Sequence, residues 1–174
     1  MSHQEHQDKA PARLTFAVLT VSDSRDESTD GSGRTILAML AERGHGLVEY
    51  RIVPDEPELI RQAVGEWLAR DDLQAVVVNG GTGVSPRDRT VEAVESLLDR
   101  QLPGFGEIFR WLSYQEIGPA AMLSRALAGT ASGRILFCLP GSTGACRLAM
   151  ERLILPQAGH FWAMLHPGPS QGRA

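Results

Sequence analysis

Blocks of apolar residues separated by polar loops predict an alternation of strands and helices along the chain. Residues 14–21 and 75–78 are short apolar runs rich in β-branched side chains, typical of strands buried on both faces, and 46–53 alternates like a strand. Helical segments follow these runs. The clearest is 54–70, where apolar residues recur at i, i+3, i+4, i+7 and i+8 from Ile60. The order β-α-β-α-β-α predicts an α/β fold with a mainly parallel sheet and helices on both sides.

The second half of the chain predicts a helix, a hairpin and a closing helix. A turn at 103–106 precedes a helix at 107–117 that carries Phe109, Trp111 and Tyr114. We expect some of these aromatic side chains to lie in the core and others to face a sister subunit. Strands at 126–130 and 134–139 form the predicted hairpin, and the closing helix runs to about residue 155.

The loops after the strands are the expected ligand site, because ligands of such sheets gather at the carboxyl ends of parallel strands. The loops that begin at Ser22, Pro54 and Gly80 therefore open on the same edge. The first spans residues 22–33, is rich in carboxylates and hydroxyls, and has a length typical of functional loops. A glycine turn at 140–144 faces the same edge if its strand is parallel to the others.

The glycine cluster GGTG at 80–83 separates a strand from a helical segment. Bare backbone N–H groups at such a strand-to-helix turn can hold a phosphate or a carboxylate. Three glycines can equally form a tight turn without any ligand. A similar choice holds for DGSG at 30–33, which offers a capping hydroxyl for an ordinary helix start or a second glycine-lined ligand site.

Composition favours one domain. The chain has 174 residues, of which 43% are hydrophobic, enough for a single core at 14–166. Residues 1–13 are polar and predict a frayed arm, and the proline- and glycine-rich tail at 167–174 is expected to be loose. Nothing in the chain approaches the roughly twenty consecutive apolar residues that cross a bilayer. We therefore expect a soluble, cytoplasmic protein that does not bind membranes.

The net charge and the few lysine, cysteine and histidine residues exclude several classes of site. The net charge of −4 and the scattered basic residues argue against a nucleic-acid partner. Lys9 is the only lysine, so a nucleotide would be bound by arginines, backbone amides and metal rather than by a P-loop lysine. Cys138 and Cys146 are expected to be a buried apolar residue and an incidental thiol, and the histidines show no zinc-site spacing.

Two aspartates stand out by position. Asp55 directly follows the second strand and Asp88 follows the glycine cluster, so both lie at the ligand edge, where a divalent cation could join them to phosphates. Each also fits a helix-capping box, DEPE at 55–58 and SPRD at 85–88. Arg87 and Arg89 beside Asp88 could bind a phosphate or pair with surface carboxylates.

Six motifs stand in order along the chain: LTVSDSRDESTDGSG, VPDE, NGGTGVSPRDRT, PGFGEIFRWLSYQEIGP, MLSRALAG and LPGSTGAC. Together they resemble the MoaB/Mog family of molybdenum cofactor biosynthesis proteins, from residue 14 to about residue 160. The fourth motif and the short chain look more like the MoaB branch. Two positions depart from the family pattern: Asn79 replaces the more usual Thr or Ser, and Ala145 replaces a proline.

The resemblance implies a three-layer α/β/α molybdopterin-binding domain that forms a homo-oligomer, a hexamer by preference or else a trimer. Active members adenylylate molybdopterin with ATP and Mg²⁺ and release pyrophosphate. The family's two functional aspartates match Asp55 and Asp88, which are thus the implied catalytic and metal-binding residues. Some MoaB relatives lack both and are thought inactive, so their presence here favours an active enzyme.

The resemblance also implies a substrate site for molybdopterin and ATP and interactions with other proteins of the pathway. The expected substrate-binding residues are Ser22, Asp30, Ser32, Gly33, Gly80, Gly81, Thr82, Gly83, Glu107, Ser124, Arg125, Pro140, Gly141 and Ser142. Two other functions stay open. One is a non-catalytic module that binds molybdopterin or scaffolds the pathway. The other is a nucleotide pyrophosphatase resembling CinA, which the expected absence of a second domain disfavours.

Overall fold

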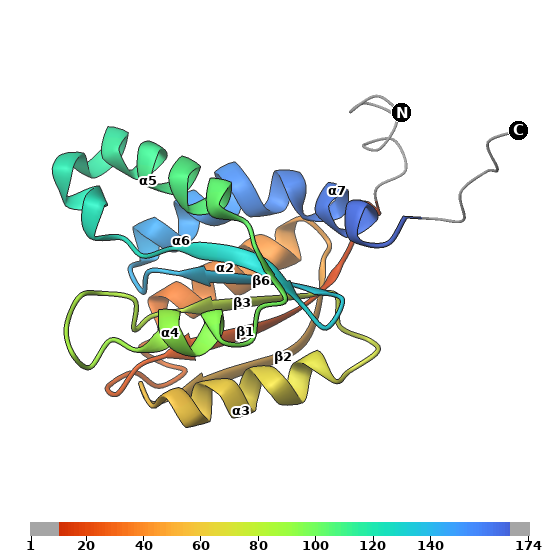
Figure 1. Ribbon diagram of the computed structural model, residues 1–174, viewed down its shortest axis with the longest axis horizontal. Helices are drawn as coiled ribbons and strands as arrows, with labels where there is room; N and C mark the ends of the chain where they lie inside the picture. The colour runs from red at the N-terminus through yellow and green to blue at the C-terminus, as the bar shows by residue number, and fades with distance from the viewer. Residues whose placement is uncertain (1–10, 168–174) are drawn as a thin grey trace, which may run out of the picture.

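A single six-stranded sheet forms the centre of the computed structural model, which describes residues 11–167 (Figure 1). The strands are β1 (Thr15–Val21), β2 (Gly46–Val53), β3 (Ala75–Asn79), β4 (Arg100–Gln101), β5 (Leu127–Ala131) and β6 (Arg134–Leu139). Their order across the sheet is β2-β1-β3-β6-β5-β4. β1, β2, β3 and β6 run parallel, and β5 is antiparallel to both of its neighbours. The predicted, mainly parallel sheet is confirmed, and the turn after β6 opens on the same edge as the loops after β1, β2 and β3.

The apolar runs occupy the middle of the sheet because helices can cover them on both faces. All of β3 is buried, as is β1 from Phe16 onward. β2 lies at the edge of the sheet, and its alternating sequence leaves most of its residues partly exposed. The predicted hairpin is formed by β5 and β6, joined at Ser132 and Gly133, which both have positive φ.

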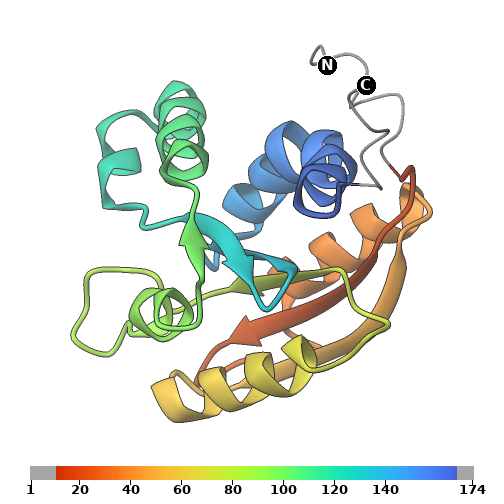
Figure 2. The same cartoon turned by 45° about the vertical axis from the view of Figure 1, so that its right-hand side comes forward.

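Helices cover both faces of the sheet and complete three layers (Figures 1 and 2). One face carries α2 (Gly31–Glu42), α5 (Pro103–Ile117), α6 (Thr143–Ala149) and α7 (Leu155–Leu165), and the other carries α3 (Pro57–Leu68) and α4 (Thr90–Glu95). Each face has its own apolar core. Phe16 and Phe109 lie in the first core, and Leu19 and Trp67 lie in the second. The α/β/α architecture is therefore confirmed.

The helices after β3 and β4 depart from the predicted boundaries. Residues 85–88 form a turn, in which Asp88 N–H donates to Ser85 O at 2.9 Å, so α4 begins only at Thr90. The predicted turn at 103–106 is instead the first turn of α5, because proline is tolerated at the first helical position.

The closing helix does not stop near residue 155. It continues through a π-helical turn, η2 (Met150–Ile154), into α7 and ends at Leu165. Pro156 explains the wider turn, because proline has no N–H for the usual bond to the carbonyl of Arg152. Leu155 N–H donates instead to Met150 O, five residues back.

The aromatic residues of α5 divide as predicted between the core and the surface. Phe109 is fully buried, whereas Ile108, Trp111, Tyr114 and Ile117 are each at least half exposed. We call these four exposed side chains the α5 face. The core position of Phe109 confirms half of the prediction, and the contact of the α5 face with a sister subunit stays a prediction.

Most of the predicted arm at 1–13 and of the predicted tail at 167–174 lies outside the described residues. From residue 11 to residue 167, the structure contains no helix long and apolar enough to cross a membrane.

Candidate functional site

The carboxyl ends of β1 and β3 lie where the chain reverses its direction across the sheet. From β1 the chain passes over one face through α2 to β2, and then over the other face through α3 to β3. In open α/β sheets, ligands bind in the crevice at such a switch point. The two predicted catalytic aspartates and the glycine cluster lie in the loops around it.

The backbones of three loops meet at Gly80. Its N–H donates to Leu139 O at 3.1 Å, which ties the end of β3 to the end of β6. A Cβ atom on Gly80 would lie 2.2 Å from Val21 O, and one on Gly141 would lie 2.9 Å from Gly80 Cα. Gly80 also has a φ of +98°. Glycine is therefore required at position 80 for the loops after β1 and β6 to close on the loop after β3.

A buried polar network lies beneath these loops. Ser32 Oγ is 2.9 Å from both Asp30 Oδ1 and Asn79 Oδ1, and Asn79 Nδ2 donates to Thr20 Oγ1 at 2.9 Å. Tyr50 OH donates to Asp30 Oδ2 at 2.6 Å. Burial alone would raise the pKa of Asp30, but hydrogen bonds from the surrounding N–H and O–H groups together lower it. The network thus holds a buried carboxylate in its ionised form.

Arg25 links this network to the turn after β6. Its Nη1 donates to Ser32 Oγ at 2.7 Å and to Gly141 O at 3.1 Å. The network also supplies the cap of α2, because Asp30 Oδ1 accepts from Gly33 N–H at 3.0 Å. The cap of α2 was predicted to be a hydroxyl, but it is the carboxylate of Asp30. Asp30 and Ser32 are engaged with protein groups, and their role in substrate binding, like that of Gly33, stays a prediction.

The glycine cluster presents a row of N–H groups that are available to a ligand. Among residues 11–167, no acceptor is bonded to the N–H groups of Gly81, Thr82 and Gly83, in contrast to that of Gly80. The cluster was predicted to lie at the positive end of a helix dipole, but α4 begins only at Thr90, so its dipole does not act at this loop. Successive amides in a loop with positive φ can still form a concave anion site. Positive φ occurs at both Gly80 and Gly81.

Arg125, which lies just before β5, donates hydrogen bonds to the loop that contains the glycine cluster. Its Nε donates to Thr82 O at 3.0 Å, its Nη2 to Asp88 O at 2.8 Å and its Nη1 to Glu92 Oε1 at 2.6 Å. Three protein acceptors thus surround the guanidinium that was predicted to contact the substrate. Its structural role is to hold the loop, and any substrate contact by Arg125 or the adjacent Ser124 stays a prediction.

Other predicted substrate residues hold local structure at the same edge. Ser22 Oγ accepts from Arg25 N–H at 3.2 Å within the first loop. Ser142 Oγ accepts from Ala145 N–H at 3.2 Å and caps α6, directly after Pro140 and Gly141. Glu107 lies apart from them, exposed on the first half of α5. Substrate contacts by these residues stay a prediction.

Asp55 is buried beside the glycine cluster. Its Oδ1 accepts from Arg89 N–H at 3.3 Å, and its own N–H donates to Asp23 Oδ1 at 3.0 Å. The capping-box alternative for Asp55 is wrong, because the cap position of α3 is Glu56 and the carboxylate of Asp55 points to another loop. Burial raises the pKa of Asp55, and the charges of Asp88 and Asp23 raise it further, against the effect of the bond from Arg89 N–H.

Asp88 lies on the other side of the same loop. Its Oδ2 accepts from Ser85 N–H at 3.0 Å, within the turn at 85–88. The helix-cap alternative is wrong here also, since the cap position of α4 is Arg89. The charge of Asp88 is one of the causes that raise the pKa of Asp55, after burial. The structure therefore places both aspartates of the predicted catalytic pair against the glycine cluster, Asp55 at Gly81 and Asp88 at Gly83.

Arg87 pairs with carboxylates rather than facing an open phosphate position. Its Nε donates to Asp23 Oδ2 at 3.0 Å, and its Nη1 lies 2.9 Å from Glu56 Oε1. The bond from Arg87 lowers the pKa of Asp23. Arg87 thus joins the loops after β1, β2 and β3, and of the two roles weighed for it, the structure shows pairing with surface carboxylates.

Thr90 is one of the residues at this site that the sequence did not single out. It is fully buried at the first position of α4, and its N–H donates to Gly81 O at 3.1 Å. A Cβ atom on Gly81 would lie 2.1 Å from Thr90 Oγ1 and 2.3 Å from Asp55 Oδ2. Both oxygens therefore point to the same side of Gly81. Nothing in the sequence signals this contact, since a threonine at a helix start is ordinary.

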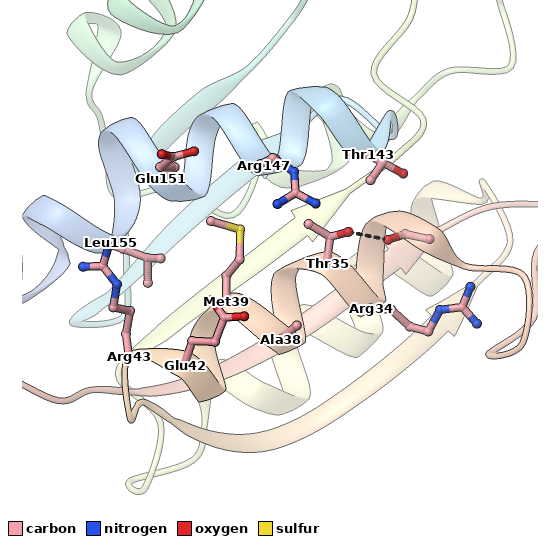
Figure 3. A pocket seen from close by; sticks show the side chains of 11 residues that line it. Arg34, Thr35, Ala38, Met39, Glu42, Arg43, Thr143, Arg147, Glu151 and Leu155 are labelled. Atoms are coloured by element: carbon pink, nitrogen blue, oxygen red, sulfur yellow. Dashed lines mark hydrogen bonds between the residues drawn. The ribbon is translucent and has the colours of Figure 1, made fainter.

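One cavity adjoins the candidate site, and a larger one runs along α2. The smaller, of about 370 Å³, is lined by Asp88, Arg89, Glu92 and Arg125 together with residues 84–86. The larger, of about 670 Å³, lies between α2 and α6, where Met39 and Arg147 extend toward each other from opposite helices (Figure 3). None of the predicted site residues lines the larger cavity. The smaller one, which contains Asp88, is the cavity that adjoins the candidate site.

The two thiols are structural. Cys138 and Cys146 are both buried and free, and burial raises the pKa of each to about 12. Cys146 Sγ donates to Pro140 O at 3.2 Å. At neutral pH neither residue provides a thiolate, so neither is suited to nucleophilic chemistry.

Asp55→Asn is expected to raise the free energy of unfolding at pH 7. Because the folded-state pKa of Asp55 is raised, the stability that its neutral form provides is complete below pH 3.8 and is lost as the pH rises through the folded-state value. Asparagine stays neutral and can still accept from Arg89 N–H. Urea unfolding of both proteins should therefore show a stability difference at pH 7 that vanishes below pH 3.8.

Asp72→Asn is the matched control for this measurement. Asp72 is exposed, and its bond with Arg70 lowers its pKa, so removing its charge should not stabilise the fold at pH 7. An Asp55→Asn protein less stable than the wild type at pH 7 would show that the ionised carboxylate supports the fold.

The chain matches a known protein family over most of its length. Residues 17–160 match the family described as a probable molybdopterin binding domain, and this range includes all the loops of the candidate site. The chain belongs to the MoaB/Mog family. This confirms the resemblance drawn from the six sequence motifs.

Individual members of the MoaB/Mog family are similar over almost their whole length. A Bacillus cereus protein named molybdenum cofactor biosynthesis protein B is 48% identical over 167 residues, which cover 95% of this chain and 99% of the relative. A crystal structure of a molybdenum cofactor biosynthesis protein B has a TM-score of 0.88 and 48% identity, over 92% of this chain and 100% of the other. The tungsten cofactor synthesizing protein MoaB from Pyrococcus furiosus has a TM-score of 0.79 and 38% identity, over 90% of this chain and 99% of the other.

Proposed function

We propose that this protein takes part in molybdenum cofactor biosynthesis by adenylylating molybdopterin with ATP. The observation that carries the proposal is the row of available N–H groups at Gly81, Thr82 and Gly83 beside the carboxylates of Asp55 and Asp88. Amides suit the binding of a phosphate, and carboxylates suit the binding of the cation that accompanies a nucleotide. The names of the relatives in the MoaB/Mog family support the pathway.

The residues at the site fit Mg²⁺ as the accompanying cation. The carboxylate oxygens of Asp55 and Asp88 lie against the same glycine loop, at Gly81 and Gly83, and two like charges in one loop favour a divalent cation. Within residues 11–167, no group of three His, Cys, Asp or Glu side chains could hold a metal. Mg²⁺ commonly uses one or two carboxylates and completes its shell with water and substrate phosphates. When bound, Mg²⁺ would supply positive charge that neutralises the triphosphate.

The proposed reaction transfers AMP between phosphates. A phosphate oxygen of molybdopterin attacks the α-phosphorus of ATP, a new P–O bond forms, and the bond to the β-phosphate oxygen breaks, so that pyrophosphate leaves with that electron pair. The nucleophile is already ionised near neutral pH, so no strong base is required. The amides of residues 81–83 would hold a phosphate in line, and the carboxylates would fix the accompanying charge. Catalysis then rests on positioning and charge stabilisation.

The α5 face supports the proposed homo-oligomer. Ile108, Trp111, Tyr114 and Ile117 are exposed on one helix, and the adjoining 3₁₀-helix η1 (Gly118–Leu123) adds exposed Met122 and Leu123. Several large apolar side chains exposed on one helix and on the element that follows it are typical of a protein interface. We propose that a second copy of the chain covers it.

The test is incubation of the purified protein with molybdopterin, ATP and Mg²⁺. We expect pyrophosphate and adenylylated molybdopterin in equal amounts, measured by a coupled phosphate assay and by mass spectrometry. Pyrophosphate should form only when molybdopterin is present. A matched reaction contains ADP-ribose and no molybdopterin. A pyrophosphatase would hydrolyse the ADP-ribose, whereas the proposed adenylyltransferase would not.

Each other outcome favours a different function. Binding of molybdopterin without pyrophosphate release would show a non-catalytic binding module. Hydrolysis of ADP-ribose or ATP in the absence of molybdopterin would show a pyrophosphatase of the CinA type. Either result would overturn the proposed adenylyltransferase.

A further inference from the structure

The hydroxyl of Thr90 is buried without a hydrogen-bond partner. Its exposed fraction is 0%, and among the described residues no donor or acceptor is bonded to Oγ1. Buried hydroxyls are nearly always bonded, because leaving one unpaired costs free energy. A valine would fill the same volume without that cost. An unpaired hydroxyl at this position therefore calls for a ligand that the protein alone does not provide.

The surroundings of Thr90 indicate which ligand. Thr90 Oγ1 and Asp55 Oδ2 both lie close to the side of Gly81 on which a Cβ atom would sit, at 2.1 Å and 2.3 Å from that position. A side chain at position 81 would therefore displace both oxygens, and the positive φ of Gly81, +61°, further favours glycine. The backbone bond from Thr90 N–H to Gly81 O fixes the two residues relative to each other.

A hydroxyl beside a carboxylate is a pair of hard oxygen ligands. In phosphoryl-transfer enzymes with a P-loop, a Ser or Thr hydroxyl and an Asp hold Mg²⁺ together with the phosphates. Here Asp55 supplies the charge, and Thr90 would supply a neutral oxygen that stays available at any pH. We propose that Thr90 Oγ1 binds, together with Asp55, the divalent cation that accompanies ATP. This inference rests on the proposed function and adds a metal ligand to it.

The first test is the stability of Thr90→Val without ligands. If the hydroxyl serves a cation and not the fold, its removal relieves an unpaired buried group. We expect the Tm of Thr90→Val to rise by about 2–4 °C. Thr90→Ser keeps the hydroxyl and should show no such rise. A lower Tm for Thr90→Val would show that the hydroxyl supports the fold, which would overturn the inference.

The second test measures cation binding directly, with Mn²⁺ in place of Mg²⁺ and α,β-methylene-ATP in place of ATP. The free Mn²⁺ signal in electron paramagnetic resonance should show that Thr90→Val binds the cation at least about 10-fold more weakly than the wild type. Thr90→Ser should bind as the wild type does. Isothermal titration of the nucleotide in EDTA should give the same affinity for all three proteins.

The outcomes separate this inference from the proposed function. A wild-type protein that binds neither Mn²⁺ nor the nucleotide would contradict the proposed function itself. Normal Mn²⁺ binding by Thr90→Val, with a functional wild type, would contradict the role of Thr90 alone. Weaker nucleotide binding by Thr90→Val in EDTA would show that the hydroxyl contacts a phosphate, which also overturns the assignment as a metal ligand.

Discussion

Asp88→Asn is expected to lower the rate of AMP transfer by about 10²- to 10³-fold, a loss typical of removing one charge-stabilising group. Asparagine keeps the oxygen that accepts from Ser85 N–H, so the turn at 85–88 should stay intact. It removes the negative charge that couples to Asp55 and that would hold a cation. The rate should be measured at saturating ATP and molybdopterin, together with molybdopterin binding, which is expected to be unchanged.

Asp72→Asn serves as the control for this substitution. It removes the same charge from the loop before β3, at the opposite edge of the sheet, where Asp72 bonds with Arg70. Its rate of AMP transfer should match that of the wild type. Full activity in Asp88→Asn would contradict a catalytic role for Asp88 and leave it only a structural role in the turn at 85–88.

Gly80→Ala is expected to destabilise the fold by about 3 kcal/mol, because it combines steric overlap with backbone strain. The new Cβ atom would lie 2.2 Å from Val21 O, a backbone atom at the end of a central strand that cannot turn away. The φ of +98° adds strain for any residue with a side chain. Urea unfolding, followed by circular dichroism, should show a lower midpoint with an unchanged slope.

Gly65→Ala provides the matched comparison. Gly65 is exposed within α3, and no described atom lies within 4 Å of a Cβ atom built there. This substitution should stabilise the protein by about 0.5–1 kcal/mol, because alanine favours a helix interior. A Gly80→Ala protein as stable as the wild type would show that the loops after β1, β3 and β6 can separate without loss.

The first half of the fold was predictable because its signals are periodic and long. In α3, apolar residues recur on one face from Ile60 to Leu68, and these are the residues that the second core buries. β1 and β3 were recognisable as apolar runs because a parallel sheet covers both of their faces. Positions at the ends of those strands then followed from topology alone.

Short-range motifs were misleading where tertiary contacts decide the conformation. The SPRD segment forms the bonds of a capping box, from Ser85 N–H to Asp88 Oδ2 and from Arg87 N–H to Ser85 Oγ, yet it closes only a turn, and α4 begins at Thr90. The closing helix was predicted too short because Pro156 usually ends a helix, whereas a single π-helical turn accommodates it.

The site itself was predictable in position but not in its contacts. Asp55 and Asp88 could be placed at the ligand edge from the strand order. Asp23, which binds Arg87 and the N–H of Asp55, belongs to a loop with several acidic residues, and nothing in the sequence distinguishes it. Thr90 was equally hidden, because its burial depends on the approach of Gly81 from another part of the loop.

The meeting of three backbones at Gly80 has a consequence for the order of folding. Val21, Gly80 and Gly141 are far apart in sequence, so their contact forms only after β1, β3 and β6 have paired. Contacts of such long range are slow to form, because the intervening loops must first be closed. On a ribosome the nascent chain can pair β1 with β2 and β3 early, but the turn after β6 is synthesised late. The loop of residues 80–83 therefore gains its final support only when almost the whole domain has been made.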